Sequence, residues 1–532
     1  PLEHVRPHPL WEICRESGTA PKNELVDVPA GKVVLGKNKD HPLYGWDNEY
    51  GHHVEDVPAH AASRYLVSNQ EFLEFVEDNG YTTSRWWTQE GWKWRAYKQC
   101  THPLFWVPGH GDYKLRTVSE EIEMPWDWPV EVNYLEAKAF CNWKSEESGK
   151  SIRLPSEAEW YLLRDRVVQT DQPYWDTAPG NINLEHYASS CPVTKFAFGD
   201  FHDVIGNVWQ WTETPITGFK GFEPHPYYDD FSTPTFDGLH NLIKGGSWIS
   251  TGNEATRDSR YAFRRHFFQH AGLRYVESDQ SVTVQVGIYE TDRSVAQYCE
   301  SHFGQDYFGV ANFPRAMSQW CLERMGNRPR NKALDLGCAV GRATFELARE
   351  FDDVTGLDWS ARFVRIGVEM KEKKLVRYAR LEEGELVSYH EVKLSDLGLE
   401  GTEQRVSFQQ ADACNLKVRY TGYDLVLATN LIDRLYNPRK FLAMIRDRIN
   451  PGGLLVIASP YSWDEAFTQK EQWIGGKRVA GEPVTTLEGL DECLEGHFTR
   501  MGEPRCVPFV IRETQRKYQH SLSEVTVWER RS

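Results

Sequence analysis

The chain has 532 residues, which is too long for a single hydrophobic core and predicts two or three domains. Hydrophobic residues make up 40% of it and aromatic residues 13%, which excludes a disordered chain, and the net charge of -16 argues against nucleic acid or an anionic membrane as partner. No apolar run approaches the roughly 20 residues of a membrane helix, and the ten cysteines form no CxxC or CxxxC pair, so we expect reduced thiols in a cytoplasmic protein.

The first residues of the chain look like a connector. Residues 1–24 are rich in proline and have no periodic core pattern, so we expect them to lead from an upstream domain into a domain at 25–280. In that domain, Ser68 and Glu71 predict a capping-box helix that ends at Gly80. A second helix is predicted over 134–147, because apolar side chains recur on one stripe.

Residues 206–275 are the most distinctive part of the sequence. They contain GNVWQWTE at 206–213, GGSW at 245–248 and GLR at 272–274, without a sustained helical or strand period. The lack of a regular period predicts loops packed on loops, with Trp209, Trp211 and Trp248 as core anchors.

These motifs, together with VPAGKVVLG at 28–36, GWDNEYGHHV at 45–54 and RLPSEAEW at 153–160, resemble the formylglycine-generating-enzyme-like (sulfatase-modifying-factor) family. The resemblance implies an α+β domain of the C-type-lectin-like fold. Enzymes of this family that make formylglycine need a reactive cysteine pair near the end of the domain. Residues 245–275 contain no cysteine, which argues against that activity.

After an expected linker at 281–298, the pattern of apolar and polar residues changes. Residues 299–532 alternate strand-like and helix-like segments, which predicts a parallel sheet with right-handed crossovers. We expect strands at 332–336, 353–357, 406–410, 423–429 and 454–459. The segment 375–405 interrupts this order, as a lid over a substrate or as a surface hairpin.

A glycine turn and a set of polar residues follow the predicted strands. Asp335, Gly337 and Gly341 lie in ALDLGCAVGR, where glycine allows the backbone to approach a ligand closely. The other residues, at the ends of later strands, are Asp358, Asp412, Ala413 and Asn430. The series resembles the class I S-adenosylmethionine-dependent methyltransferases, which implies an α/β Rossmann-like domain that binds S-adenosylmethionine through these residues.

The order of the two domains resembles the ovothiol-biosynthesis family of 5-histidylcysteine sulfoxide synthases with a C-terminal methyltransferase. The resemblance implies that iron(II) and O2 couple cysteine to histidine, that a separate lyase releases 5-thiohistidine, and that the methyltransferase methylates a ring nitrogen. In the family, a DinB-like N-terminal domain holds the iron through a histidine triad. The chain has no His-x3-His-x-Glu stretch, and Pro7 and Pro9 break the helix that His4 and His8 would need to bind a metal, so we expect no metal ligands in it.

The same resemblance implies catalytic and substrate-binding residues in the first domain. Tyr227 matches a functional tyrosine of related synthases, and Tyr228 follows it, although both could instead be half-buried packing residues. Arg264 and Arg265, with Tyr261 beside them, could clamp amino-acid carboxylates, although an intramolecular salt bridge is the ordinary role of such an arginine.

Two other functions remain open from the sequence. The first is an ergothioneine-type synthase acting on trimethylhistidine, although in such fusions we expect the methyltransferase ahead of the iron domain. The second is a noncatalytic lectin-like docking module fused to an unrelated small-molecule methyltransferase. The expected partners are in every case small-molecule substrates.

Overall fold

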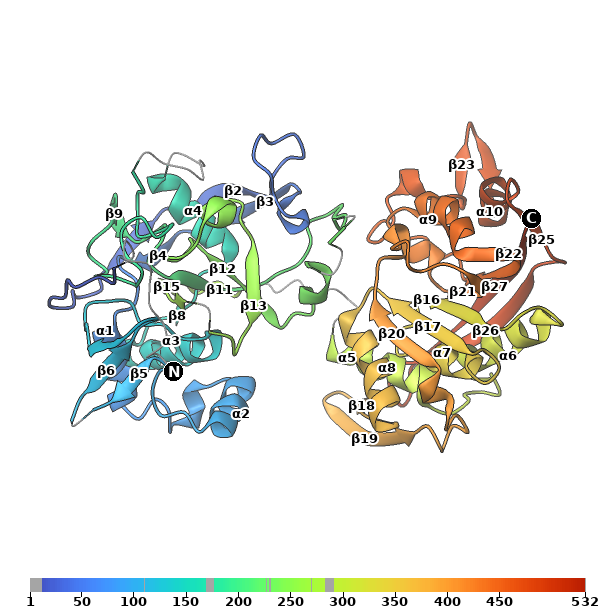
Figure 1. The fold of residues 1–532 in the computed structure, drawn as a ribbon, viewed down its shortest axis with the longest axis horizontal. Coiled ribbons are helices and arrows are strands. Elements are labelled where there is room, and N and C mark those ends of the chain that lie inside the picture. The colour runs from blue at the N-terminus through green and yellow to red at the C-terminus, as the bar shows by residue number, and fades with distance from the viewer. Residues whose placement is uncertain are drawn as a thin grey trace. The chain divides into compact units, whose positions relative to one another are not determined.

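The computed structural model describes residues 12–109, 111–168, 177–225, 227–228, 231–268, 270–282 and 291–531. The chain forms two compact units, one of residues 1–223 with 238–285 and the other of residues 224–237 with 286–532. Each unit has its own hydrophobic clusters, as expected for a chain of this length (Figure 1).

The first unit contains helices and small sheets, most of them antiparallel, connected by long loops (Figure 1). One sheet has the order β1 (Leu25–Val28), β4 (His60–Ser63), β15 (Val276–Glu277), β8 (Ile152–Arg153), and another has the order β13 (Tyr261–Arg264), β12 (His240–Lys244), β11 (Trp209–Pro215), β14 (Ala271–Gly272). Smaller sheets pair β2 (Gly31–Leu35) with β3 (His53–Val57), β9 (Ala197–Phe198) with β10 (Phe201–His202), and β5 (Trp106–Pro108) with β6 (Tyr113–Arg116) and β7 (Glu121–Glu123). The helices are α1 (Asn69–Glu77), α2 (Gln89–Lys98), α3 (Tyr134–Ser148) and α4 (Glu157–Val167).

The predicted capping box of α1 forms only in part. The Ser68 side chain accepts a hydrogen bond from the backbone of Glu71, as predicted, but the Glu71 carboxylate accepts from Asn23 and Tyr275 instead of returning to the cap. The helix ends at Glu77, before the predicted end at Gly80. The tertiary partners of Glu71 therefore replace the local one.

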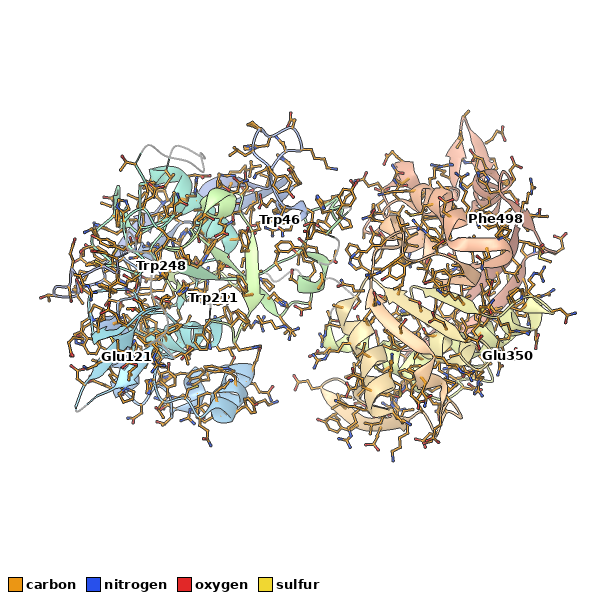
Figure 2. All side chains as sticks on the ribbon, viewed as in Figure 1. Trp46, Glu121, Trp211, Trp248, Glu350 and Phe498 are labelled. Atoms are coloured by element: carbon orange, nitrogen blue, oxygen red, sulfur yellow. The ribbon has the colours of Figure 1, made fainter. Side chains whose placement is uncertain are left out.

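Aromatic side chains fill the interior of the first unit. Trp209, Trp211 and Trp248 are buried, which confirms them as core anchors, and Trp211 and Trp248 lie inside the unit in Figure 2. Phe72 of α1 stacks on Phe140 of α3 with ring centroids 5.2 Å apart. Such contacts hold long loops together where regular structure is sparse.

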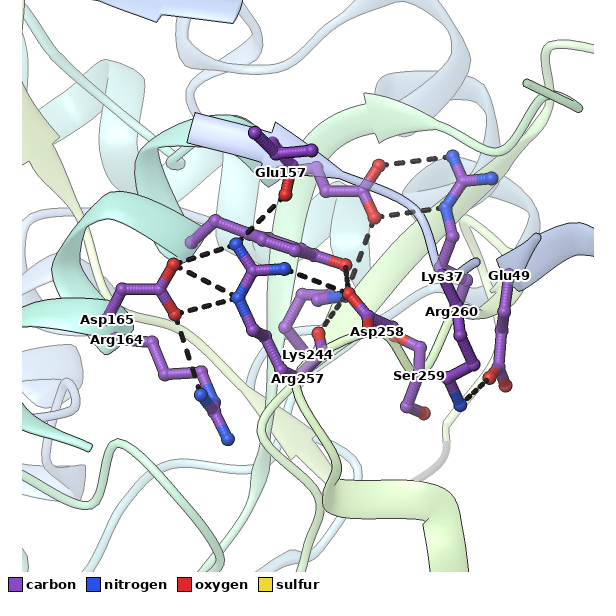
Figure 3. Close-up of polar contacts among 12 residues, drawn as sticks. Lys37, Glu49, Glu157, Arg164, Asp165, Lys244, Arg257, Asp258, Ser259 and Arg260 are labelled. Carbon is purple, nitrogen blue, oxygen red and sulfur yellow. Dashed lines mark hydrogen bonds and ion pairs between the residues drawn. The ribbon is translucent and has the colours of Figure 1, made fainter. Parts of the chain in front are cut away.

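The first unit also buries charged side chains (Figure 3). Glu157, at the start of α4, accepts two hydrogen bonds from Arg260, at 3.0 and 3.1 Å, and lies 3.4 Å from Lys244 Nζ. Burial would raise the pKa of Glu157, but the two cations outweigh it and lower the pKa. Burial lowers the pKa of Lys244 to about 8, against the attraction of Glu157. This cluster fixes the loop that precedes β13 onto α4.

The second unit is a doubly wound sheet covered by helices on both faces (Figure 1). Its strand order is β20 (Val406–Gln410), β17 (Asp353–Asp358), β16 (Lys332–Leu336), β21 (Tyr423–Thr429), β22 (Ile449–Ser459), β27 (Tyr518–Arg530), β25 (Phe498–Arg500), with β26 (Arg505–Arg512) paired to β27. The strands from β20 to β22 are parallel, as predicted, and β27 is antiparallel to β22. The two fold classes expected from the sequence are therefore both present.

The two faces of this sheet have separate cores. One core joins the sheet to α6 (Phe313–Met325), α7 (Arg342–Leu347) and α8 (Ala361–Lys373), and the other joins it to α9 (Pro438–Ile445) and α10 (Thr486–Leu494). Helix α5 (Asp292–Phe303) begins within the stretch expected to be a linker. The interruption after α8 is an antiparallel hairpin of β18 (Leu375–Glu383) and β19 (Leu386–Lys393), and a second hairpin pairs β23 (Lys477–Val479) with β24 (Glu482–Val484).

Candidate functional site: a cofactor cradle at the carboxyl edge of the sheet

The strand order of the second unit reverses between β16 and β21. From β16 the chain continues through β17 to β20 on one side, whereas β21 and β22 lie on the other side. In open α/β sheets, ligands bind outside the carboxyl ends of the strands at such a switch point. The predicted cofactor residues follow the strands at this edge.

Asp335 near the end of β16 is a buried carboxylate with one unused oxygen. Its Oδ2 accepts a hydrogen bond of 2.7 Å from the Thr344 hydroxyl, whereas Oδ1 has no hydrogen-bond partner among the described residues. Burial raises the pKa of Asp335 to about 7, although the hydrogen bond from Thr344 lowers it. A buried acceptor without a partner is costly, so this oxygen is suited to receive a donor from a ligand.

Gly337 and Gly341 form the turn after β16, and both have left-handed backbone angles, with φ of 72° and 95°. A Cβ atom on Gly341 would lie 2.5 Å from Phe408 Cε1, and one on Gly337 would lie 3.3 Å from Leu431 Cδ1. Glycine is therefore required at position 341 by both the backbone angle and the available space.

Asp358, at the end of β17, faces this turn. Its Oδ2 accepts a hydrogen bond of 2.8 Å from the backbone N–H of Ala339, and its Oδ1 accepts one of 2.8 Å from Ser360. Burial raises the pKa of Asp358 to about 6, against the lowering effect of these backbone donors. A carboxylate can accept about four hydrogen bonds, so Asp358 keeps capacity for ligand hydroxyls.

Asp412 and Ala413 follow β20, and Asn430 follows β21. Asp412 is buried and accepts hydrogen bonds of 2.8 Å from the Cys414 backbone and from the Tyr436 hydroxyl. Ala413 is half-buried beside it. Asn430 has a left-handed φ of 51°, and its Oδ1 accepts from the Ser523 hydroxyl. Parallel strands place all these residues at one edge, and the Ala339–Asp358 bond joins the glycine turn to the end of β17.

These groups fit S-adenosylmethionine. The acceptor oxygen of Asp335 suits the ammonium group of this ligand, and the carboxylate of Asp358 suits its ribose hydroxyls. The glycine turn between them leaves no room for a side chain at Gly341. The sequence did not single out Thr344 or Ser523, which hold Asp335 and Asn430 in place. Thr344 lies only nine residues after Asp335, in the helix that follows the glycine turn, so its position near Asp335 could have been inferred from the sequence. Ser523 lies 93 residues after Asn430, and nothing in the sequence indicates that the two are in contact.

The predicted substrate-binding residues of the first unit lie on and after β13. Arg265 is already committed to the protein, because it donates hydrogen bonds to Asn241, Glu90 and Gly238 at 2.8 to 2.9 Å. Arg264 is exposed, and its side chain has no hydrogen bond or ion pair to a described residue, although its backbone pairs with β12.

The third of these residues, Tyr261, is half-buried. It accepts a hydrogen bond of 3.3 Å from the Trp46 indole, and burial raises its pKa. Of the three predicted residues, only Arg264 therefore presents a charged group that no described residue neutralises.

Tyr227 and Tyr228 belong to the segment 224–237, which groups with the second unit. The two residues are 82% and 56% exposed, so neither is a half-buried packing residue. Both phenols lie at the surface, where a substrate can reach them.

The described residues contain no group of three His, Cys, Asp or Glu side chains that could bind a metal ion. His4 and His8 lie outside the described residues. The part of the chain that the structure describes therefore does not fit iron. In those same ranges, no helix combines the length and the apolar character needed to cross a membrane.

Two family models match the chain. The Sulfatase-modifying factor enzyme 1-like domain matches residues 13–278, and the Methyltransferase domain matches residues 311–496. These matches agree with the domain order expected from the sequence.

Among curated proteins, hercynine oxygenase of Mycobacterium tuberculosis is 33% identical over 257 residues, which cover 45% of this chain and 58% of that protein. Ergothioneine biosynthesis protein 1 of Schizosaccharomyces pombe is 27% identical over 290 residues, which cover 52% of this chain and 33% of that protein. The formylglycine-generating enzyme of Mycobacterium tuberculosis is 27% identical over 283 residues, which cover 42% of this chain and 87% of that protein.

The chain thus spans little more than half the length of the hercynine oxygenase that it matches. Its first half is similar to that enzyme, and its second half has the methyltransferase fold. The chain belongs to the Sulfatase-modifying factor enzyme 1-like domain family, and a methyltransferase domain follows that domain in the same chain.

Proposed function

We propose that the chain contributes to two reactions, the oxidative joining of cysteine sulfur to an imidazole ring and the methylation of a product of that reaction. The observation that supports this proposal is the combination in one chain of a hercynine-oxygenase-like domain with a methyltransferase unit whose acidic residues fit S-adenosylmethionine. The absence of cysteine between residues 245 and 275 separates it from formylglycine formation.

The version we favour is ovothiol biosynthesis. Histidine, cysteine and O2 give 5-histidylcysteine sulfoxide, and the second unit methylates a ring nitrogen of 5-thiohistidine. The position of the methyltransferase domain after the first domain supports ovothiol, because in an ergothioneine-type fusion we expect the methyltransferase ahead of the iron domain. The alternative is an ergothioneine-type reaction on hercynine, which the names of the matched hercynine oxygenase and ergothioneine biosynthesis protein support.

In the methylation reaction, S-adenosylmethionine supplies an electrophilic methyl group when bound. Asp335 Oδ1 would accept a hydrogen bond from its ammonium group, and Asp358 would accept from its ribose hydroxyls. The backbone of Gly337 and Gly341 allows the cofactor to approach closely. Because a ring nitrogen is itself the nucleophile, the main contribution of the protein is to align it with the methyl group.

In the oxidative reaction, the chain would contribute substrate contacts. In the first unit, Arg264 offers a guanidinium that no described residue pairs with and that suits an amino-acid carboxylate. Considered separately, Tyr227 offers an exposed phenol that can donate a proton. Iron is implied only by the similarity to an oxygenase, and the described residues do not provide its ligands.

The test is methylation by the chain itself. We would incubate it with S-adenosylmethionine and, separately, 5-thiohistidine, histidine or hercynine, and follow the products by mass spectrometry. The proposal expects a gain of one methyl group with 5-thiohistidine only. Methylation of histidine itself would favour the ergothioneine type, and no methylation of any of the three despite cofactor binding would overturn the proposed substrate class.

A further inference from the structure

Two adjacent strands of the second unit end in unusual backbone conformations. Asn430 follows β21 with a φ of 51°, and Tyr461 follows β22 with a φ of 52°. Left-handed angles are uncommon for residues other than glycine and concentrate at functional sites, although asparagine tolerates them better than tyrosine. Since β21 and β22 are parallel neighbours, both residues lie at the carboxyl edge of the sheet.

The side chain of Asn430 is held in one orientation by β27. The hydroxyl of Ser523, which is fully buried, donates a hydrogen bond of 2.6 Å to Asn430 Oδ1. Because the oxygen is used in this way, the amide nitrogen points away from Ser523. Its two N–H groups have no hydrogen-bond partner among the described residues, and the side chain is only half-buried. Asn430 therefore presents a fixed donor at the edge of the sheet.

Asn430 borders the cofactor cradle on the side away from Asp358. In the parallel pairing of β16 with β21, Leu336 lies opposite Ala428, so Asn430 is at the level of the glycine turn. A Cβ on Gly337 would touch Leu431, which shows how closely this loop approaches the turn. The ribose side of the cradle is set by Asp358 on β17, so the side of β21, β22 and β27 is left for the second reactant.

We infer that Asn430 binds the methyl acceptor and that Ser523 is the positioning residue that aims its amide. The amide would donate a hydrogen bond to an anionic atom of the acceptor, either the amino-acid carboxylate or the thiolate on the imidazole ring. This rests on the proposed function, and it moves Asn430 from the cofactor, where the sequence places it, to the acceptor. In the transfer, the ring nitrogen lone pair forms the new N–C bond, and the S–C bond breaks with its electrons passing to sulfur. Asn430 exchanges no proton in this step.

Three variants of the full chain test this inference. Asn430→Asp keeps the shape of the side chain and its bond from Ser523, but replaces the amide donor with a negative charge. Ser523→Ala leaves the Asn430 amide free to rotate. Ser521→Ala is the matched control, because it makes the same change two residues earlier on the same face of β27 without a hydrogen bond to Asn430.

The measurements are the KM and kcat for 5-thiohistidine, calorimetric binding of 5-thiohistidine to the protein loaded with S-adenosylhomocysteine, and the Kd of S-adenosylmethionine. We expect Asn430→Asp to weaken acceptor binding about 10- to 100-fold, the range of a hydrogen bond to a charged group, and Ser523→Ala to raise the KM several-fold with a smaller effect on kcat. The Kd of S-adenosylmethionine should change less than about twofold, which also shows that each variant is folded.

Acceptor analogues identify the anionic atom. If the carboxylate is the partner, Asn430→Asp and the wild type should bind decarboxylated 5-thiohistidine with equal affinity. If the thiolate is the partner, the two proteins should bind the S-methylated compound with equal affinity. Equal weakening of S-adenosylmethionine binding, or unchanged acceptor binding in both variants, would overturn the inference. A wild-type chain that does not methylate 5-thiohistidine at all would instead overturn the proposed function on which the inference rests.

Discussion

The Thr344 hydroxyl in α7 donates a hydrogen bond of 2.7 Å to Oδ2 of Asp335 at the end of β16. This bond orients the carboxylate so that Oδ1 remains without a partner among the described residues, at the edge of the sheet where the predicted cofactor residues lie. The bond also opposes the effect of burial on the pKa of Asp335, which is about 7. The charge on this carboxylate therefore depends on Thr344.

Replacing Thr344 with valine should weaken S-adenosylmethionine binding at neutral pH. Loss of the donor raises the pKa of Asp335 further above 7, so that more of the carboxyl group is protonated at pH 7. We expect a Kd about tenfold higher at pH 7, with partial recovery at pH 8.5, in calorimetric titrations. Thr344→Ser, which keeps the hydroxyl, should bind as the wild type does. If Thr344→Val bound S-adenosylmethionine as tightly as the wild type at pH 7, this role of Thr344 would be contradicted.

Cofactor affinity should fall in acid in two stages. In the proposed site, both carboxylates would bind the cofactor in the charged form, and burial raises their pKa values to about 7 for Asp335 and about 6 for Asp358. Affinity should therefore be complete only about one pH unit or more above 7, decrease as Asp335 is protonated and decrease more steeply below pH 6, by up to about tenfold per pH unit for each group. Asp358→Asn should bind more weakly and show only the first stage. A wild-type profile that is flat from pH 8 to 5 would exclude direct binding by these groups.

Gly341→Ala should destabilise the second unit more than Gly401→Ala. The two glycines have nearly the same backbone angle, with φ of 95° and 93°, but only at Gly341 would a Cβ collide with Phe408, since the space beside Gly401 is open. We expect a cost of about 1 kcal/mol for Gly401→Ala from the backbone alone, and about 1–3 kcal/mol more for Gly341→Ala. Thermal unfolding of the full chain followed by circular dichroism compares them, and equal midpoints would mean that Phe408 moves aside without cost.

In the first unit, Glu157→Gln should be more damaging than Lys244→Met. Removing the carboxylate leaves Arg260 and Lys244 buried without their counter-charge, a change that typically costs about 3–5 kcal/mol. Removing Lys244 costs less, because Arg260 still pairs with Glu157 and because the pKa of Lys244 is already lowered to about 8 by burial. Urea unfolding followed by tryptophan fluorescence measures both, and the reverse order would show that Lys244 is the main counter-ion.

Tyr227→Phe should leave the stability of the chain unchanged, within about 0.5 kcal/mol, because the side chain is 82% exposed. If the phenol donates a proton during the oxidative reaction, sulfoxide formation by the complete enzyme should fall while methylation of 5-thiohistidine is retained. Tyr97→Phe is a suitable control, since Tyr97 has the same exposure on α2. Unchanged sulfoxide yield and product ratio would exclude a catalytic role for Tyr227.

The parallel strands of the second unit could be read from the sequence, whereas the antiparallel strands β25, β26 and β27 were not predicted. β16, β20 and β21 have the predicted bounds, because buried parallel strands are short apolar runs that end at glycine or polar turns. β22 begins at Ile449, five residues before the predicted Leu454, since Ile449 also pairs with Tyr423 through a shift in register. That early start depends on the neighbouring strand and has no local signature.

The sequence by itself determined the two fold classes, the glycine turn and the acidic residues that follow the strands, because each depends on residues close together in the chain. Only the tertiary structure decided which side chains are free to act. Arg265 is held by Glu90, Asn430 is aimed by Ser523, and Glu71 binds Tyr275, although these partners lie 175, 93 and 204 residues apart. Side-chain hydrogen bonds have a short range in space and no limit in sequence separation, so such pairs appear only when the chain is folded.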